Sequence, residues 1–185
     1  MSGILLVLVA ATAAVANGQV FLNHRCQNLS VVQNFNVAKY LGLWYEHQKV
    51  DVSFEAGGIC STANYTLRSN GTVEVHNRQV DSSSGKPKDI FGSASLDSSV
   101  GEAKLKVVFP SEGGIEAPYW VLSTDYTSYA VVWSCENLAL RSIQFAWVLT
   151  RHKSPSESAL QTVKQVIASN NLTDLPLELT PQTCS

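Results

Sequence analysis

The four cysteines are the residues of this chain with the widest choice of chemistry. Cys26, Cys60, Cys135 and Cys184 are widely separated, and none forms a Cys-x-x-Cys pair. That spacing does not favour a metal site or a redox motif. In an exported chain an even number of cysteines indicates disulfides, here two, and the sequence alone leaves three pairings open.

The other candidates for chemistry are four histidines and one methionine. His24, His47, His76 and His152 lack the close spacing of metal ligands, and no Ser/His/Asp motif accompanies them. The single methionine, Met1, leaves with the leader described below, so a mature chain has no thioether for redox work. The sequence therefore predicts neither an enzyme nor a metal protein.

Export is predicted from the first eighteen residues. An almost unbroken apolar run at residues 4–15 precedes the small residues Ala16 and Gly18, which suit a signal peptidase. The run is too short to span a bilayer, and no later apolar segment reaches membrane-spanning length. We expect a signal peptide at residues 1–18, with cleavage after Gly18, and one secreted domain at residues 19–185.

The composition is that of an ordinary soluble domain. The 185 residues are 45% hydrophobic and carry 15 acidic against 13 basic side chains, a net charge of −2. Without a cluster of Lys and Arg, nucleic acid is not expected as a partner. Four N-x-S/T sequons, at Asn28, Asn64, Asn70 and Asn171, are candidate glycosylation sites of an exported protein.

Short strands separated by turn signals fill the middle of the chain. The predicted strands are residues 40–50, 60–67, 72–80, 89–96, 104–109, 119–124, 129–135 and 143–151. Asn70-Gly71 predicts a hairpin turn, and residues 82–85 and 112–114 predict loops. Eight strands in meander order indicate an all-β fold, either a sandwich or an up-and-down antiparallel barrel.

One helix is predicted after the strands. Ser154 as N-cap, Pro155 at the first helical position and Glu157 three residues after the cap form a capping signature. The apolar residues that follow share one stripe: Ala159, Leu160, Val163, Val166 and Ile167. We therefore expect this helix to pack one face against the outside of the sheet and to expose Lys164.

Alternation along the strands separates an inner face from an outer one. If Asn64 carries a glycan it points outward, which sends Ala63, Tyr65 and Leu67 inward. The same alternation places inward Val73, Val75 and Asn77; Leu105, Val107 and Phe109; and Phe145, Trp147 and Leu149. This set is apolar except for Asn77, which is the composition of a pocket for an apolar ligand with one orienting hydrogen bond. A packed core would show the same alternation, so the pattern alone leaves a filled interior open.

Three motifs, in order along the chain, resemble those of the lipocalin family. Residues 34–46 contain Gly42-x-Trp44, Thr124-Asp125-Tyr126 follows, and residues 145–151 end in Arg151. Within the family the chain is most similar to the branch of apolipoprotein D and its invertebrate relatives, the insect bilin-binding proteins included. Residues 55–60, 63–65, 117–120, 129–135 and 169–171 support that narrower placement.

The resemblance implies an eight-stranded antiparallel up-and-down barrel with one C-terminal helix packed outside it. Gly42 and Trp44 would lie at its closed end, with Arg151 stacked across the indole ring and the turn at residues 124–126 beside them. The resemblance also implies a disulfide pairing of Cys26 with Cys135, and of Cys60 with Cys184.

The function implied is non-covalent carriage of a small hydrophobic molecule such as a lipid, steroid, retinoid, fatty acid, bilin or carotenoid, with no required cofactor. The pocket residues carried over by the resemblance are Tyr65, Asn77, Phe109 and Trp147, with Leu149 deeper. A cell-surface receptor or a lipoprotein particle is the further partner implied. Two alternatives stay open: a coloration protein that holds a bilin or carotenoid, and a structural or adhesive secreted β-domain with a filled core.

Overall fold

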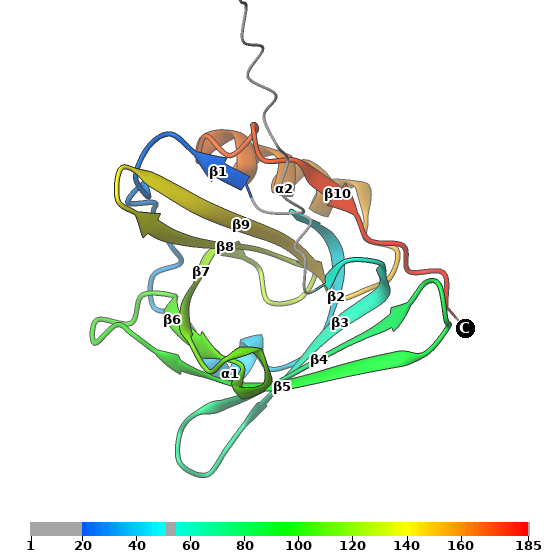
Figure 1. Ribbon diagram of the computed structural model, residues 1–185. Coiled ribbons are helices and arrows are strands. Elements are labelled where there is room, and N and C mark those ends of the chain that lie inside the picture. Colours follow the sequence, from blue (N-terminus) through cyan, green and yellow to red (C-terminus); the bar gives the residue numbers. More distant parts are fainter. Residues whose placement is uncertain (1–19, 51–54, 185) are drawn as a thin grey trace, which may run out of the picture.

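In the part of the chain that the structure describes, ten antiparallel strands form one sheet that curls round and closes on itself (Figure 1). The computed structural model describes residues 20–50 and 55–184, so the predicted signal peptide lies outside the described residues. The elements are β1 (Val20–Leu22), α1 (Val37–Tyr40), β2 (Gly42–Val50), β3 (Gly58–Leu67), β4 (Val73–Asp81), β5 (Pro87–Leu96), β6 (Lys104–Val108), η2 (Pro110–Glu112), β7 (Glu116–Thr124), β8 (Tyr129–Leu138), β9 (Arg141–Thr150), α2 (Glu157–Ser169) and β10 (Leu177–Leu179).

Closure of the barrel is made by the pairing of β2 with β9. Strands β2 to β9 each pair with the next along the chain, and β9 returns to β2, where Tyr45 faces Thr150 and Lys49 faces Trp147. The predicted up-and-down barrel is therefore confirmed, and the sandwich is not. All eight predicted strands are present, although β7 begins three residues earlier than expected, at Glu116.

The predicted hairpin turn joins β3 to β4. Gly71 adopts a φ of 84°, which a side chain would disfavour, and the Arg68 amide donates to the Thr72 carbonyl oxygen. Leu67, which was expected to point inward, is 51% exposed instead. Pairing of β3 with β2 ends at Tyr65, so Leu67 has lost the neighbouring strand that would cover it.

A short helix lies across one end of the barrel, where the sequence predicted the start of a strand. The Asn36 side chain caps α1 by accepting from the Lys39 amide at 3.0 Å, and Tyr40, the last residue of α1, is buried. The prediction of strand from residue 40 was thus wrong by two residues. The strand begins at Gly42, whose φ of 88° turns the chain into the sheet.

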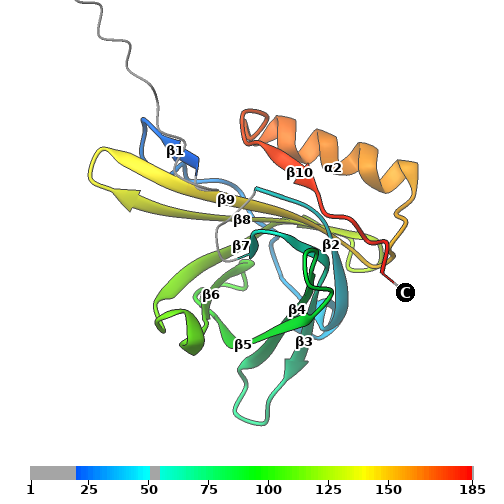
Figure 2. The ribbon, with the colours of Figure 1, turned by 45° about the vertical axis from the view of Figure 1, so that its right-hand side comes forward.

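The C-terminal helix packs on the outside of the barrel, as predicted, against β8 (Figure 2). Its buried face includes Ala159 and Val163. The predicted cap was wrong: Ser156, not Ser154, accepts from the Ala159 amide at 3.2 Å. Pro155 therefore precedes the cap and Glu157 is the first helical residue, where its negative charge faces the positive end of the helix dipole.

Two strands that the sequence did not predict extend the sheet beyond the barrel. β1 pairs with β9, and β10 pairs with β2 at Val50 to Gln48. Beyond β10 the chain continues as a strap to Cys184, and the Pro181 carbonyl oxygen accepts from the Cys60 amide at 2.7 Å. The strap thus lies between β2 and β3, where their direct pairing has ended.

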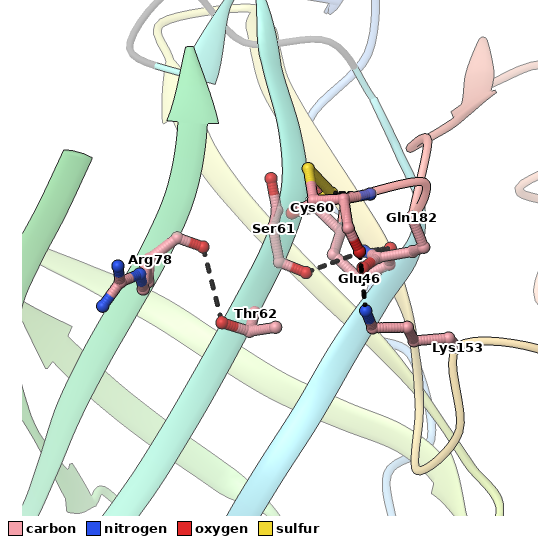
Figure 3. The surroundings of a disulfide bond; sticks show 8 residues. Glu46, Cys60, Ser61, Thr62, Arg78, Lys153 and Gln182 are labelled. Carbon is pink, nitrogen blue, oxygen red and sulfur yellow. Dashed lines mark hydrogen bonds between the residues drawn. A yellow bond between two sulfur atoms is a disulfide. The ribbon is translucent and has the colours of Figure 1, made fainter. Parts of the chain in front are cut away.

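Two disulfides anchor these terminal segments. Cys26 is joined to Cys135 on β8 with Cα atoms 5.8 Å apart, and Cys60 on β3 is joined to Cys184 with Cα atoms 6.1 Å apart (Figure 3). All four cysteines are oxidised, so no thiol is left for nucleophilic or metal chemistry.

Candidate ligand-binding cavity

The interior of the barrel is hollow. A cavity of about 360 Å³ lies within it and is lined by residues from all eight barrel strands and from α1. The five residues proposed from the sequence all contribute to the wall: Tyr65, Asn77, Phe109, Trp147 and Leu149. A completely filled core is therefore not what the chain forms.

The wall is apolar because the alternation of each strand sends its aliphatic side chains inward. Val73, Val75, Leu105 and Val107 are buried and line the cavity, while Lys104 and Lys106, which alternate with the last two, point outward. Toward the open end the lining becomes polar. Arg78, the neighbour of the inward-facing Asn77, also lies at this rim, and its side chain is largely exposed.

Phe109 enters the cavity because Gly92 has no side chain. A Cβ atom at position 92 would lie 2.7 Å from Cδ1 of Phe109, closer than two carbon atoms approach. The glycine on β5 therefore creates the space that the phenyl ring fills.

Three tyrosine hydroxyls form a chain at the inner end of the cavity. The Tyr119 hydroxyl lies 3.0 Å from that of Tyr40 and 2.9 Å from that of Tyr65. The Tyr40 and Tyr65 rings stack with centroids 5.5 Å apart. Burial raises the pKa of Tyr65 to about 12 and raises the pKa values of Tyr40 and Tyr119 well above 10, so all three phenols stay protonated at neutral pH. We call these three residues the tyrosine floor; the sequence pointed to Tyr65 alone.

Below the tyrosine floor the barrel is plugged by Trp44 and Arg151. Trp44 is fully buried, donates from its indole nitrogen to the Tyr40 carbonyl oxygen at 2.8 Å, and lies under the Arg151 guanidinium, 3.7 Å from the ring centroid. The guanidinium donates to five backbone carbonyl oxygens, those of Tyr126, Leu43, Lys39, Tyr40 and Leu41. Position 42 favours glycine because its φ is 88°, which a residue with a side chain adopts only with strain; a Cβ there would meet Nη1 of Arg151 at an ordinary contact distance of 3.6 Å.

The turn at residues 124–126 holds the plug from the other side. Partial burial raises the pKa of Asp125, but hydrogen bonds to the carboxylate from the Ser128 hydroxyl and from the Ser128, Tyr129 and Thr127 amides outweigh it and keep this pKa below its usual range. Thr124 donates to the Tyr129 carbonyl oxygen at 2.6 Å. Every residue placed at the closed end from the sequence lies there.

Buried charges, which the sequence analysis missed, lie on the other side of the cavity. Lys49 Nζ is 3.3 Å from Glu46 Oε1 and 3.0 Å from Glu55 Oε2, and Thr180 on the strap donates to Glu46 at 2.7 Å. Burial, together with the negative charge of Glu55, raises the pKa of Glu46 to about 7. Both carboxylates line the cavity.

The strap closes the wall beside this cluster. Gln182 Nε2 donates to the Glu46 and Ser61 carbonyl oxygens, each at 2.9 Å, so one side chain ties β2 to β3 (Figure 3). Lys153 holds the same segment by donating to the Cys184 carbonyl oxygen. Ser61 is one of the lining residues, and its hydroxyl oxygen is buried without a hydrogen-bond partner.

The histidines form no site of their own. His76 lies outside the barrel, with Nε2 2.6 Å from Asp89 Oδ1 and its ring stacked on Phe91. Within residues 20–50 and 55–184, no three His, Cys, Asp or Glu side chains come together as a metal site would require. Over the same residues, none of the helices has both the length and the apolar character to cross a membrane.

Comparison with known proteins agrees with this geometry. The lipocalin-like domain model matches residues 35–182. Apolipoprotein D of Cavia porcellus is 40% identical over 184 residues, covering 97% of this chain and 94% of that protein. The bilin-binding protein of Pieris brassicae is 31% identical over 173 residues, covering 90% and 88%. Insecticyanin from Manduca sexta shares the fold, with a TM-score of 0.77 at 21% identity over 88% of this chain and 89% of that one.

A closed eight-stranded barrel with one plugged end and an apolar interior defines a protein that encloses a small hydrophobic molecule. The chain belongs to the lipocalin family, whose members carry small hydrophobic ligands. Within that family it is similar to apolipoprotein D over nearly its whole length, as the motifs predicted.

Proposed function

We propose that this protein is a secreted carrier that holds one small hydrophobic molecule, without a covalent bond, inside its barrel. The observation that carries the proposal is the apolar cavity of about 360 Å³. A ligand that buries about 250 Å² of apolar surface gains roughly 6 kcal/mol at about 25 cal/mol per Å². A dissociation constant of 1 μM requires about 8 kcal/mol net. Close packing against the wall and hydrogen bonds to the tyrosine floor therefore have to add to the gain from apolar burial and offset the cost of association.

The wall residues have distinct tasks in this proposal. Phe109, Trp147 and Leu149 supply apolar contact, and Asn77 supplies an amide on the wall that orients a polar substituent. No step of bond making is assigned to any of them.

Titration of the purified protein with retinoids, steroids and fatty acids tests the proposal. Trp147 lines the cavity, so a bound apolar ligand is expected to change its fluorescence in a saturable way. Mass spectrometry of ligand extracted from protein of its natural source identifies the occupant. Failure of every apolar class to bind, together with an empty native protein, would contradict carriage.

A pigment is the second candidate cargo. The 31% identity to a bilin-binding protein over 90% of this chain favours it. A bilin or carotenoid in the cavity would give the native protein a band of visible absorbance. A colourless native protein with a bound lipid would exclude coloration as the role and leave carriage intact.

Secretion is supported by several features of the chain. The apolar leader at residues 4–15, the two disulfides, and the exposed side chains of Asn28, Asn70 and Asn171 suit an exported glycoprotein, while Asn64 is half-buried. Expression in a secreting cell line should yield a mature chain that begins at Gln19, with a mass that falls on enzymatic removal of N-glycans. A carrier of this kind also delivers its cargo to a partner, a cell-surface receptor or a lipoprotein particle, which cross-linking on intact cells would capture.

A further inference from the structure

The tyrosine floor is a polar group at the inner end of an otherwise apolar cavity. Its three hydroxyl oxygens lie in sequence, Tyr40 to Tyr119 at 3.0 Å and Tyr119 to Tyr65 at 2.9 Å, and all three residues line the cavity. The hydroxyls come from α1, β7 and β3, so tertiary structure alone brings them together.

Counting protons shows that this chain of hydroxyls is incomplete. Three phenols carry three protons, and two oxygen–oxygen contacts use two of them, whichever atom donates in each. One phenolic proton therefore remains without an acceptor inside the chain. A buried donor left unpaired is costly, so the floor favours any molecule that brings an oxygen to it.

The charges around the cavity restrict what kind of oxygen this is. The nearest cation beneath the floor, Arg151, already donates to five backbone carbonyl oxygens. Lys49 is paired with Glu46 and Glu55, and these two carboxylates are the charges that line the cavity wall there. Among the described lining residues the basic ones are Arg78 on β4 and Lys88 on β5, both toward the open end. In the pairing of these strands Arg78 is opposite Asp89, and Lys88 is opposite Gln79. A carboxylate at the floor would therefore be buried without a cation free to pair with it.

We propose that the floor of the cavity selects ligands whose inner end carries a neutral oxygen that accepts a hydrogen bond, a ketone or an alcohol, over hydrocarbons and carboxylates. The selection rests on the proposed carrier function, and it assigns Tyr40, Tyr65 and Tyr119 as its determinants. A fatty acid would bind in the opposite sense, with its tail at the floor and its carboxylate at the rim near Arg78.

A matched pair of small ligands tests the selection directly. Tetralone differs from tetralin by one carbonyl group in place of a methylene. Calorimetric titration is expected to show that tetralone binds about tenfold tighter than tetralin or better, because only the ketone satisfies the donor. The carbonyl stretching frequency of bound tetralone should fall, as it does when a carbonyl accepts a hydrogen bond. Tetralin carboxylate should bind no tighter than tetralin.

Variants separate the hydroxyls from the shape of the floor. Removing one tyrosine hydroxyl still leaves at least one unpaired proton, so the informative variant is the triple change Tyr40→Phe, Tyr65→Phe and Tyr119→Phe. It should bring the tetralone-to-tetralin ratio close to one and restore the carbonyl frequency, while tetralin affinity is kept. Tyr129→Phe is the matched control, because this buried tyrosine bonds Ser123 at 2.8 Å outside the cavity lining. It should leave the ratio unchanged.

The outcomes distinguish this inference from the function on which it rests. Equal affinities of the wild-type protein for tetralin and tetralone, with an unshifted carbonyl band, would overturn the selection and leave carriage standing. Absence of binding by any apolar ligand would overturn carriage itself. Because the wild-type measurements need no variant, the inference is testable even if the triple variant does not fold.

Discussion

The two ends of the barrel solve the problem of burying charge in opposite ways. At the closed end the Arg151 guanidinium rests on Trp44 and donates only to backbone carbonyl oxygens, none of which titrates. On the side of the open end, Lys49 lies between two carboxylates, one of which has a pKa raised to about 7. Above the acid range in which Asp125 titrates, closed-end stability should therefore be independent of pH, while the stability of the region under the strap should depend on pH through Glu46.

The two regions also differ in what holds them together. The closed end is built from a helix, a turn and strand ends that contact one another through the plug residues. The wall near the open end is completed by the strap, whose Gln182 joins carbonyl groups of β2 and β3 and whose Cys184 is bonded to Cys60. The comparison indicates a fixed base and a wall whose integrity depends on one inserted segment.

Replacing one tryptophan by alanine in each region, the closed end and the cavity wall, should give the largest difference in stability between the two. Trp44→Ala should lower the free energy of unfolding by about 4 kcal/mol, because it removes a fully buried ring and leaves a cavity under Arg151. Trp147→Ala, the matched change in the ligand cavity, should cost less than about 2 kcal/mol but weaken ligand binding about tenfold. Urea unfolding followed by circular dichroism, with ligand titration, measures both. Equal losses of unfolding free energy in the two variants would contradict the distinction between a structural closed end and a ligand-binding wall.

Removing the disulfide that holds the strap to β3 should give the next largest effect on stability. Cys60→Ser with Cys184→Ser should cost about 3 to 4 kcal/mol, since the bridge closes a loop of 124 residues. It should also speed ligand dissociation, because the strap spans the gap between β2 and β3. The pair Cys26→Ser with Cys135→Ser, which closes a loop of similar length, should lose comparable stability without changing the dissociation rate. Identical dissociation rates in both double variants would show that the strap is not part of the functional wall.

The pH dependence of stability sharpens the contrast in charge. Because the folded pKa of Glu46, about 7, lies above its ordinary 4.5, the folded protein holds a proton that the unfolded chain releases between these values. This carboxyl therefore contributes stability that is fully present below pH 4.5 and is lost as pH rises through about 7. Glu46→Gln should remove that slope, which amounts to at most about 3 kcal/mol. The test is the free energy of unfolding measured from pH 4.5 to 7 for both proteins. A pH slope that persists in Glu46→Gln would show that other groups cause it.

The smallest of these effects on stability is expected for a conservative change of Arg151 at the closed end. Arg151→Lys should lower the free energy of unfolding by about 2 kcal/mol, because an ammonium cannot stack flat on Trp44 or reach five carbonyl oxygens in one plane. The loss should be the same across pH 4.5 to 7 in a Glu46→Gln background, and ligand affinity should barely change. A larger loss of affinity than of stability would place Arg151 in the binding site instead.

The strands were predictable because a barrel imposes one rule on all of them. Each has a lumen side and an outer side, so alternation assigned Val107, Phe109 and Trp147 to the interior, where they lie. Closure itself came only from the family resemblance, since the pairing of β2 with β9 joins residues about a hundred positions apart. Leu67 shows the limit of the rule, which ceases where a neighbouring strand ends.

The residues and the helix that the sequence did not predict were missed because local features overrode or obscured the alternation pattern. A register shift in β2 between Glu46 and Gln48 buries both Glu46 and Lys49, which simple alternation would place on opposite faces. Tyr119 is followed directly by Trp120, so aromatic character alone did not tell which of the two points inward. For α1, the Asn36 cap was a visible signal, but a helix of four residues has too short a pattern to outweigh the strand that follows.

The position of the strap in the chain has a consequence for biosynthesis. Residues 177–184 leave the ribosome more than a hundred positions after the strands that they hold together, and their cysteine must then find a partner 124 residues upstream. Until that bond forms, the segment that lies between β2 and β3 has no covalent attachment to the barrel. Formation of the Cys60–Cys184 disulfide is therefore the step that fixes this part of the cavity wall, and we expect a ligand to be retained firmly only after the bond has formed.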